Sequence, residues 1–335
     1  MNHVQEIKDL LSSPKRIAIT THQRPDGDAM GSSLGLFHYL TALGHKVKIV
    51  SPTPYAEYLA WMPGAKDIIV GPEDKDLAEW TFEGADAIFC LDFNALHRIN
   101  EFEKPVKDSM GKKIMIDHHM DPQEFYDYQY WDDKASSTAE MIFRLMEELD
   151  HLGYLSKDVA TSLYTGIMTD TGSFRFTSTT PRVHRMVARM METGINVNEI
   201  YDNIMSNSSV DRLKFIGHCL TERLKVVPEL NTAYMMVPKE VFKTYNIKTG
   251  ETEGLVNYAL GIRNVKLGVL MTVQDNIVKL SFRSRGQVNS AQLAGNFGGG
   301  GHFYASGGKS TGTLDETEKK LLALLEEHKD MLLAD

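Results

Sequence analysis

The sequence predicts an α/β domain, built on a mostly parallel sheet with helices on both faces, followed by a smaller α+β domain. Within the first 130 residues, short apolar runs alternate with amphipathic stretches and with turns rich in glycine and proline, which is typical of parallel strands joined by helices. From about Val226 the pattern changes to more closely spaced strands. The length of 335 residues suits two domains of about 100 to 200 residues, each with its own core.

The first domain begins with a series of predicted strands. Each is a short apolar run bounded by polar or turn-forming residues, at 16–20, 46–50, 67–70, 86–91 and 112–116. Helices are predicted at 29–43, 137–150, 159–169 and 181–192. Gly44 is placed to end the first of these helices, and Ser137 and Glu140 have the spacing of a capping box at the start of the second.

The second domain is predicted from a different order of elements. Strands are expected at 232–237, 265–273 and 277–283, with a short helix at 238–245 and a longer terminal helix at 315–333. Weak helical character continues through 197–223, between the two patterns. We therefore expect a first domain at 1–194, a helical linker at 195–225 and a second domain at 226–335.

Composition excludes several classes of protein. The 45 Asp and Glu outnumber the 36 Lys and Arg, and the resulting charge of −9 argues against coating of long nucleic acid. Two cysteines, Cys90 and Cys219, cannot build a disulfide framework, and neither lies in the CxxC pair of a zinc knuckle. No run approaches the roughly 18 apolar residues of a membrane span, and the N-terminus lacks the pattern of a signal peptide. We expect a cytoplasmic protein that has no membrane partner.

Acidic and histidine residues gather where three of the predicted strands end. Because the carboxyl ends of parallel strands form one edge of an open sheet, and ligands bind beyond that edge, we expect these side chains to meet there. A further candidate, Asp170, lies at the end of an apolar helix and can close the site. The full set is His22, Asp26, Asp28, Asp92, Asp117, His118, His119 and Asp170.

So many carboxylates cannot converge without a compensating cation, because neighbouring negative charges raise one another's pKa. Carboxylate oxygens and imidazole nitrogens without thiolates suit Mn²⁺, Mg²⁺ or Fe²⁺ better than a structural zinc. The supply of ligands exceeds the need of one ion, which favours two metals about 3.5–4 Å apart that share a carboxylate and activate a water. Phosphate ester hydrolysis is the natural reaction of such a centre. Taken singly, the segment 22–28 also fits a turn followed by a helix with acidic residues near its positive N-terminus. Asp92 also fits a solvated loop residue, and His118 with His119 fits a surface pair.

The second domain holds a possible phosphate-binding segment. Arg283 leaves a predicted strand, and the run Gly298–Gly301 is followed by His302. Consecutive glycines let backbone N–H groups approach an anion, and arginine makes bidentate contacts to phosphate. The alternative is a flexible turn beside ordinary edge-strand charges. Arg98, six residues after Asp92, fits a phosphate contact and a solvated side chain equally well.

In order and spacing, these residues resemble the four motifs of the DHH phosphoesterase superfamily. The motifs here are His22-x₃-Asp26-x-Asp28, Asp92, Asp117-His118-His119 and Asp170. Arg283 and the glycine run with His302 resemble the DHH-associated C-terminal domain, so the resemblance spans about residues 15 to 310. The two-domain length is similar to the NrnA-type group of oligoribonucleases (nanoRNases) and pAp phosphatases. That resemblance implies Mn²⁺-dependent cleavage of very short RNA and removal of the 3′-phosphate from adenosine 3′,5′-bisphosphate (pAp).

The resemblance also implies a role for each residue in a centre of two metal ions, Mn²⁺ or another divalent cation such as Mg²⁺. His22 and Asp26 would hold the first ion; Asp28, His118 and Asp170 would hold the second, with Asp92 as the bridge. Asp117 would orient a histidine, and His119 would face the substrate phosphate near the leaving oxygen. The residues implied in substrate binding are Arg98, Arg283, Gly299, Gly300, Gly301 and His302.

Other activities remain open. An inorganic pyrophosphatase or exopolyphosphatase of the same superfamily would share the metal residues, and a non-catalytic nucleotide-binding sensor could use the same fold. We expect short RNA and phosphorylated nucleotides as partners, and the sequence leaves a homodimer open. The local charge favours binding of a short phosphorylated ligand by the second domain. Residues 226–311 hold nine Lys and Arg against five Asp and Glu, a net charge of +4, which leaves −13 for the rest of the chain.

Overall fold

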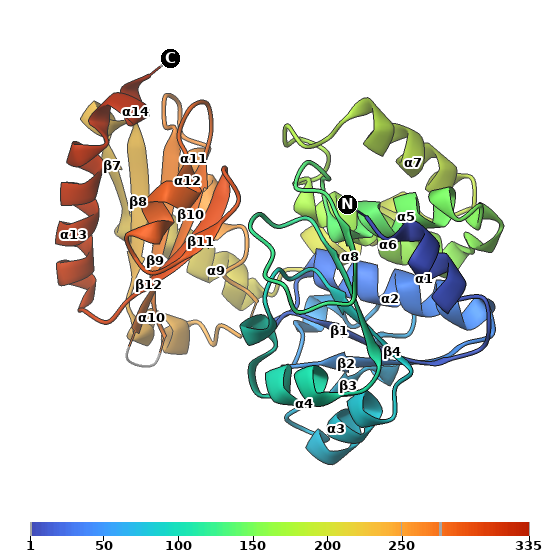
Figure 1. Ribbon diagram of the computed structural model, residues 1–335. Coiled ribbons are helices and arrows are strands. Elements are labelled where there is room, and N and C mark those ends of the chain that lie inside the picture. The colour runs from blue at the N-terminus through green and yellow to red at the C-terminus, as the bar shows by residue number, and fades with distance from the viewer. Residues whose placement is uncertain (1, 249, 275–276, 335) are drawn as a thin grey trace. The chain divides into compact units, whose positions relative to one another are not determined.

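The computed structural model describes residues 2–248, 250–274 and 277–334 (Figure 1). It divides into two compact units, Met1–Asn207 and Ser208–Asp335. The division falls inside the segment 195–225, which is expected to be a linker and which forms the helices α8 (Val197–Met205) and α9 (Val210–His218) and a π-helical turn (Cys219–Arg223). Among the described residues, no helix has both the length and the apolar character needed to cross a membrane.

The first unit contains a six-stranded sheet in the order β3-β2-β1-β4-β5-β6, and every pairing in it is parallel. This confirms the predicted parallel α/β sheet. Its strands are β1 (Arg16–Thr21), β2 (Lys46–Ser51), β3 (Ile69–Val70), β4 (Ala87–Leu91), β5 (Lys112–Asp117) and β6 (Tyr128–Trp131). The third strand is shorter than the expected 67–70, because a 3₁₀ turn at Ala65–Asp67 takes up its start. The edge strand β6 is not among the predicted strands, although the alternation of Tyr126, Tyr128 and Tyr130 is typical of a strand.

Helices cover both faces of this sheet (Figure 1). Alternate residues of each strand point to opposite faces, so Ile17 and Ile19 join one core while Ala18 joins the other. The larger core packs beneath α2, α5 and α6, and the smaller one beneath α3 and α4. The helices of the unit are α1 (Val4–Leu10), α2 (Gly27–Ala42), α3 (Lys75–Glu83), α4 (Glu103–Asp108), α5 (Thr138–Glu148), α6 (Lys157–Asp170), α7 (Pro181–Met191) and α8, with 3₁₀ turns at Glu57–Leu59, Leu96–Phe102 and Leu152–Tyr154.

A row of glycines lets α2 and α6 pack with their backbones almost in contact. A Cβ atom built on Gly31 would lie 2.6 Å from the Ser162 carbonyl oxygen and 2.7 Å from the Gly166 nitrogen. Because both neighbours are backbone atoms, neither can rotate away. The close packing brings the N-terminal end of α2 beside the C-terminal end of α6, where Asp170 lies.

We expect Gly31→Ala to destabilise the fold by about 1–3 kcal/mol, since the added methyl group overpacks a rigid helix contact. The urea midpoint of unfolding measures the loss. Gly153→Ala is the matched control, because a Cβ at Gly153 meets no heavy atom within 4 Å. Equal midpoints for the two variants would contradict the backbone-to-backbone packing of α2 and α6.

The second unit is a mixed sheet in the order β11-β12-β10-β9-β8-β7, in which β8 and β9 pair parallel and the other neighbours antiparallel. This is the expected α+β architecture. Its strands are β7 (Leu224–Val227), β8 (Thr232–Val237), β9 (Leu267–Gln274), β10 (Ile277–Ser284), β11 (Gly300–Gly301) and β12 (Ala305–Ser310). One core lies under α12 (Ser290–Gly295), α13 (Leu314–Glu327) and α14 (Lys329–Leu333), and the other under α9, α10 (Lys239–Thr244) and α11 (Leu255–Leu260). In place of the single terminal helix expected at 315–333, the structure has two helices, α13 and α14, which are separated at His328.

Candidate metal centre

The sheet order places the candidate residues of the first unit at its topological switch point. β1 and β4 are neighbours, and the chain runs from β1 toward β3 on one side and from β4 toward β6 on the other. Ligands of open α/β sheets bind beyond the strand ends at such a point. His22 follows β1, Asp92 follows β4, and Asp117 and His118 stand at the end of β5.

Asp26 and Asp28 lie at the start of α2, and Asp26 also acts as its N-cap. The Asp26 Oδ1 atom accepts hydrogen bonds from the Asp28 and Ala29 N–H groups, at 3.0 and 3.1 Å. The alternative of acidic residues at the N-terminus of a helix is therefore correct in itself, and Asp26 also caps that helix. It does not exclude a second role, because Asp26 Oδ1 also lies 4.0 Å from His22 Nε2.

Asp92 is the common member of three groups whose ligand atoms lie within 4.8 Å of one another. The groups within the first unit are His22–Asp26–Asp92, Asp28–Asp92–His118 and Asp92–Asp117–His119. The Asp92 Oδ2 atom lies 3.4 Å from His22 Nε2, and its Oδ1 atom lies 3.5 Å from His118 Nε2. One carboxylate therefore presents a separate oxygen to each of two histidines, which is the arrangement that a bridging ligand requires.

Two histidines are oriented by backbone carbonyl groups. His22 Nδ1 lies 2.8 Å from the Gln23 oxygen, and His118 Nδ1 lies 3.3 Å from the Ala135 oxygen. Such contacts favour the tautomer with the proton on Nδ1, which leaves Nε2 as the electron-pair donor of the neutral ring. In both rings Nε2 is the atom that faces the carboxylates.

Asp170 joins the cluster from the last residue of α6. Its Oδ2 atom lies 3.4 Å from His118 Nε2, and His118 Nε2 lies 3.8 Å from Asp28 Oδ2. Unusual backbone conformations flank the site: Asp92 has φ of 64°, and Ser173 and Phe174, just after Asp170, have φ of 61° and 63°. Positive φ is costly for residues other than glycine and concentrates at functional sites.

The charges of the cluster are strongly coupled. Burial raises the pKa of Asp28 well above its ordinary value, and the nearby charges of Asp92 and Asp170 add to this rise. Burial also raises the pKa of Asp170 to about 6, although the charge of His118 opposes the change. For Asp92 the balance is reversed: burial raises its pKa, but hydrogen bonds with His118 and His22 outweigh burial and hold the pKa well below the usual range.

The pKa values of His22 and His118 are raised, although burial by itself lowers the pKa of a histidine. Burial alone lowers the pKa of His22, but the hydrogen bond with Asp92 and the charge of Asp26 raise it to about 9. The pKa of His118 is raised well above its ordinary value in the same way, by Asp92 and Asp170. Protons therefore supply the positive charge that these carboxylates need. A divalent cation would supply it too, so the donor set and its charge fit a metal site.

Asp117 and His119 form a tight pair beside this cluster. His119 Nδ1 lies 2.7 Å from Asp117 Oδ1 and 3.7 Å from Asp92 Oδ1. Asp117 is completely buried, and its Oδ2 atom has no hydrogen-bond partner among the described residues. A buried carboxylate on one ring nitrogen fixes the ring and raises the basicity of the other nitrogen.

Arg98 lies in the 3₁₀ turn Leu96–Phe102, which follows β4 and Asp92. Its backbone oxygen accepts a hydrogen bond from the Gln23 N–H at 2.8 Å, which ties its 3₁₀ turn to the loop after β1. The positive charge of Arg98 acts to lower the pKa of His22, so the guanidinium is close enough to interact with the cluster electrostatically.

The remaining candidates come together in the second unit. Arg283 pairs with Ala305 across β10 and β12, and its Nη1 atom donates to the Phe282 oxygen at 3.0 Å. His302 and Ala305 close the turn between β11 and β12, with the His302 N–H donating to the Ala305 oxygen at 2.8 Å. The glycine run is not a loose turn, because a Cβ at Gly299 would lie 1.9 Å from the Gly307 oxygen. Gly300 and Gly301 pair with β12.

Sequence reasoning missed the groups that hold Asp28. The N–H groups of Thr138 and Ala139, at the start of α5, donate to its two carboxylate oxygens at 2.6 and 2.9 Å. The Thr138 hydroxyl donates to Asp92 Oδ1 at 3.0 Å. The capping-box spacing of Ser137 and Glu140 located this helix start, but nothing local indicates that it faces residues more than 40 positions away in sequence.

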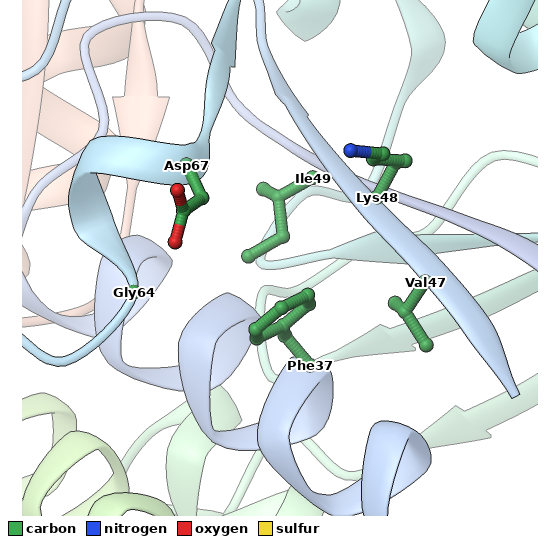
Figure 2. Close-up of a pocket in the computed structure, with 6 residues that line it drawn as sticks. All are labelled: Phe37, Val47, Lys48, Ile49, Gly64 and Asp67. Carbon is green, nitrogen blue, oxygen red and sulfur yellow. The ribbon is translucent and has the colours of Figure 1, made fainter. Parts of the chain in front are cut away.

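A separate pocket of about 190 Å³ lies between α2 and β2 (Figure 2). Its lining mixes apolar and charged residues, namely Phe37, Val47, Lys48, Ile49, Gly64 and Asp67. None of these six is a candidate site residue, so the pocket does not belong to the metal centre.

Comparisons with known proteins agree with this architecture. The family described as "DHH family, N-terminal domain" matches residues 16–167, and the DHHA1 domain matches residues 232–330. The bifunctional oligoribonuclease and PAP phosphatase NrnA of Thermus thermophilus is 32% identical over 98% of this chain and 94% of its own length. The Bacillus subtilis protein of the same name is 28% identical over 92% and 93%. A crystal structure of an exopolyphosphatase-related protein from Bacteroides fragilis superposes with a TM-score of 0.94, at 36% identity, covering 98% of this chain and 97% of that one.

Proposed function

Because the chain belongs to the DHH family, with a DHHA1 domain after the DHH domain, we propose that it is a phosphoesterase with two divalent metal ions. The proposed substrates are very short 5′-phosphorylated oligoribonucleotides and the 3′-phosphate of pAp. Relatives named as oligoribonucleases and PAP phosphatases, which align over nearly the whole chain, support this choice. We propose Mn²⁺ as the metal and the cytoplasm as the compartment.

The observation that carries the proposal is the position of Asp92 between two histidine-carboxylate groups. We propose that His22 and Asp26 hold one ion, that Asp28, His118 and Asp170 hold the other, and that Asp92 bridges them. When bound, two such ions would lower the pKa of a water and neutralise charge on the phosphoryl oxygens.

Other residues of the chain have proposed roles in handling the substrate and its protons. Asp117 holds the His119 ring through Nδ1, at 2.7 Å, so that its Nε2 side can face the phosphate and give a proton to the leaving oxygen. Arg98, Arg283, Gly299, Gly300, Gly301 and His302 are proposed to bind the substrate's phosphate and nucleotide. Fixed N–H and guanidinium donors stabilise phosphoryl charge without rearranging during the reaction.

A substrate panel tests the proposal. Purified protein is incubated with 5′-phosphorylated di- to pentanucleotides, pAp, pyrophosphate and polyphosphate, in Mn²⁺, in Mg²⁺ and in EDTA. We expect Mn²⁺-dependent release of mononucleotides and of phosphate from pAp, which EDTA abolishes and added Mn²⁺ restores. Absence of turnover above the EDTA control on both RNA and pAp would refute the nucleotide assignment.

One relative favours a second activity. Because the protein with TM-score 0.94 is described as exopolyphosphatase-related, polyphosphate is the principal competing substrate in the panel. A higher kcat/KM on polyphosphate than on any nucleotide would select that alternative. Tight nucleotide binding without turnover in Mn²⁺ would instead select a nucleotide-binding sensor.

A further inference from the structure

The start of α5 contacts two of the proposed metal ligands through one residue, Thr138. Its N–H donates to Asp28 Oδ2 at 2.6 Å, and its hydroxyl donates to Asp92 Oδ1 at 3.0 Å. Thr138, Asp28 and Asp92 are all buried, with exposed fractions of 0%, 1% and 2%. Hydrogen bonds between buried partners are shielded from competing water, so both contacts restrict the carboxylates strongly.

The segment that carries Thr138 is itself held in place. Ser137 caps the helix by accepting from the Glu140 N–H at 3.0 Å, and the Ser136 N–H donates to Glu140 Oε2 at 2.7 Å. Glu140 Oε1 lies 3.8 Å from Arg144 Nη1, which donates to Asp132 at 2.7 Å. This network ties the start of α5 to neighbouring residues, which holds Thr138 in position.

Helix capping alone does not account for the Thr138 hydroxyl. Ser137 and Glu140 already supply the cap, and Thr138 is the first residue of α5, so no carbonyl of an earlier helical turn is available to its hydroxyl. Here the hydroxyl donates instead to Asp92. The bond restricts rotation of that carboxylate, so that Oδ1 stays toward His118 while Oδ2 stays toward His22.

We propose that Thr138 is a positioning residue, whose hydroxyl fixes the Asp92 carboxylate and whose N–H fixes Asp28 before any metal binds. This inference rests on the proposed function, because it takes both carboxylates as metal ligands. Preorganised ligands need no reordering when an ion arrives, so loss of the hydroxyl should weaken metal binding.

Thr138→Val and Thr138→Ser test the hydroxyl. Valine keeps the shape and the N–H but removes the donor, whereas serine restores it. We expect the Mn²⁺ dissociation constant, measured by calorimetry on chelator-treated protein, to rise about 10- to 100-fold in Thr138→Val and to stay near wild type in Thr138→Ser. The EPR spectrum of bound Mn²⁺ should change in the valine variant alone.

Thr165→Val is the matched control. Among the described residues, the buried Thr165 hydroxyl donates to the Thr161 backbone oxygen of its own helix and to no metal-ligand candidate. Thermal melts confirm that each variant is folded. Wild-type Mn²⁺ affinity and spectrum in a folded Thr138→Val protein would overturn the positioning role while leaving the proposed function standing. If wild-type protein bound no Mn²⁺, both would fail; if it bound Mn²⁺ but cleaved no substrate, only the proposed function would fail.

Discussion

Asp92→Asn should lose nearly all activity while the protein stays folded. Asparagine keeps the size of the side chain and can still accept from Thr138, but it removes the negative charge that the cluster shares. Because Asp92 is proposed to bridge the two ions, both ions would lose the negative charge of the same ligand. If the lost stabilisation is about 4 kcal/mol, the rate falls about 10³-fold. Initial rates on a 5′-phosphorylated dinucleotide and on pAp, at saturating Mn²⁺, measure this loss.

A second measurement separates loss of metal from loss of fold. Calorimetric titration of the Asp92→Asn variant should show weaker binding of Mn²⁺ with a reduced stoichiometry. Asp86→Asn is the control, since Asp86 pairs on the surface with Arg16 at 3.1 Å and takes no part in the cluster. Wild-type turnover by Asp92→Asn would refute the assignment of Asp92 as the bridge.

The edge of the sheet that carries the cluster was predictable because it follows from topology. Parallel strands send their carboxyl ends to one side, so the residues after 16–20, 86–91 and 112–116 had to share an edge. Side-chain type alone makes these carboxylates and imidazoles candidate metal ligands, whereas the assignment of each residue to an ion is what the family resemblance implies. Neither step requires knowledge of contacts between distant segments, and this is why the spacing of His22, Asp92 and His118 was informative.

The parts that sequence reasoning missed depend on contacts between distant segments. β6 is short and lies at the edge of the sheet, and the N-terminus completes its bonding: the His3 N–H donates to the Gln129 oxygen at 2.9 Å, and Asn2 Oδ1 accepts from the Trp131 N–H. Its pairing is not encoded in its own four residues. The contact of Thr138 with Asp28 spans 110 positions and is invisible to local pattern in the same way.

β12 was missed for a different reason. Its sequence, Ala-Ser-Gly-Gly-Lys-Ser, lacks the β-branched and aromatic residues that favour strands, so propensity predicts a loop. The structure needs small residues there, because a Cβ at Gly308 would lie 2.7 Å from the Phe297 Cβ. Tertiary packing therefore overrides local preference, and the same strand supports the glycine run on one side and Arg283 on the other.

Arg283→Ala should raise KM for phosphorylated substrates about 10- to 100-fold, because a charge-assisted hydrogen bond to phosphate contributes about 1.5–3 kcal/mol. kcat should change less, since the proposed contact binds the substrate and Arg283 is not among the proposed metal ligands. The KM of Arg283→Lys should lie between those of wild type and Arg283→Ala, because lysine keeps the positive charge but not the planar pair of donors.

Arg285→Ala is the control for Arg283, since it removes the same charge two residues further along. The Arg285 guanidinium donates to the Leu260 backbone oxygen, so its local role is structural, and we expect its KM to match wild type. Steady-state kinetics of the three variants on pAp and on a 5′-phosphorylated dinucleotide separate a specific phosphate contact from a general loss of positive field. If Arg283→Ala and Arg285→Ala raise KM equally, the positive field of the segment, and not the Arg283 contact, binds the substrate. If neither changes KM on any phosphorylated substrate, the assignment of substrate binding to this segment is wrong.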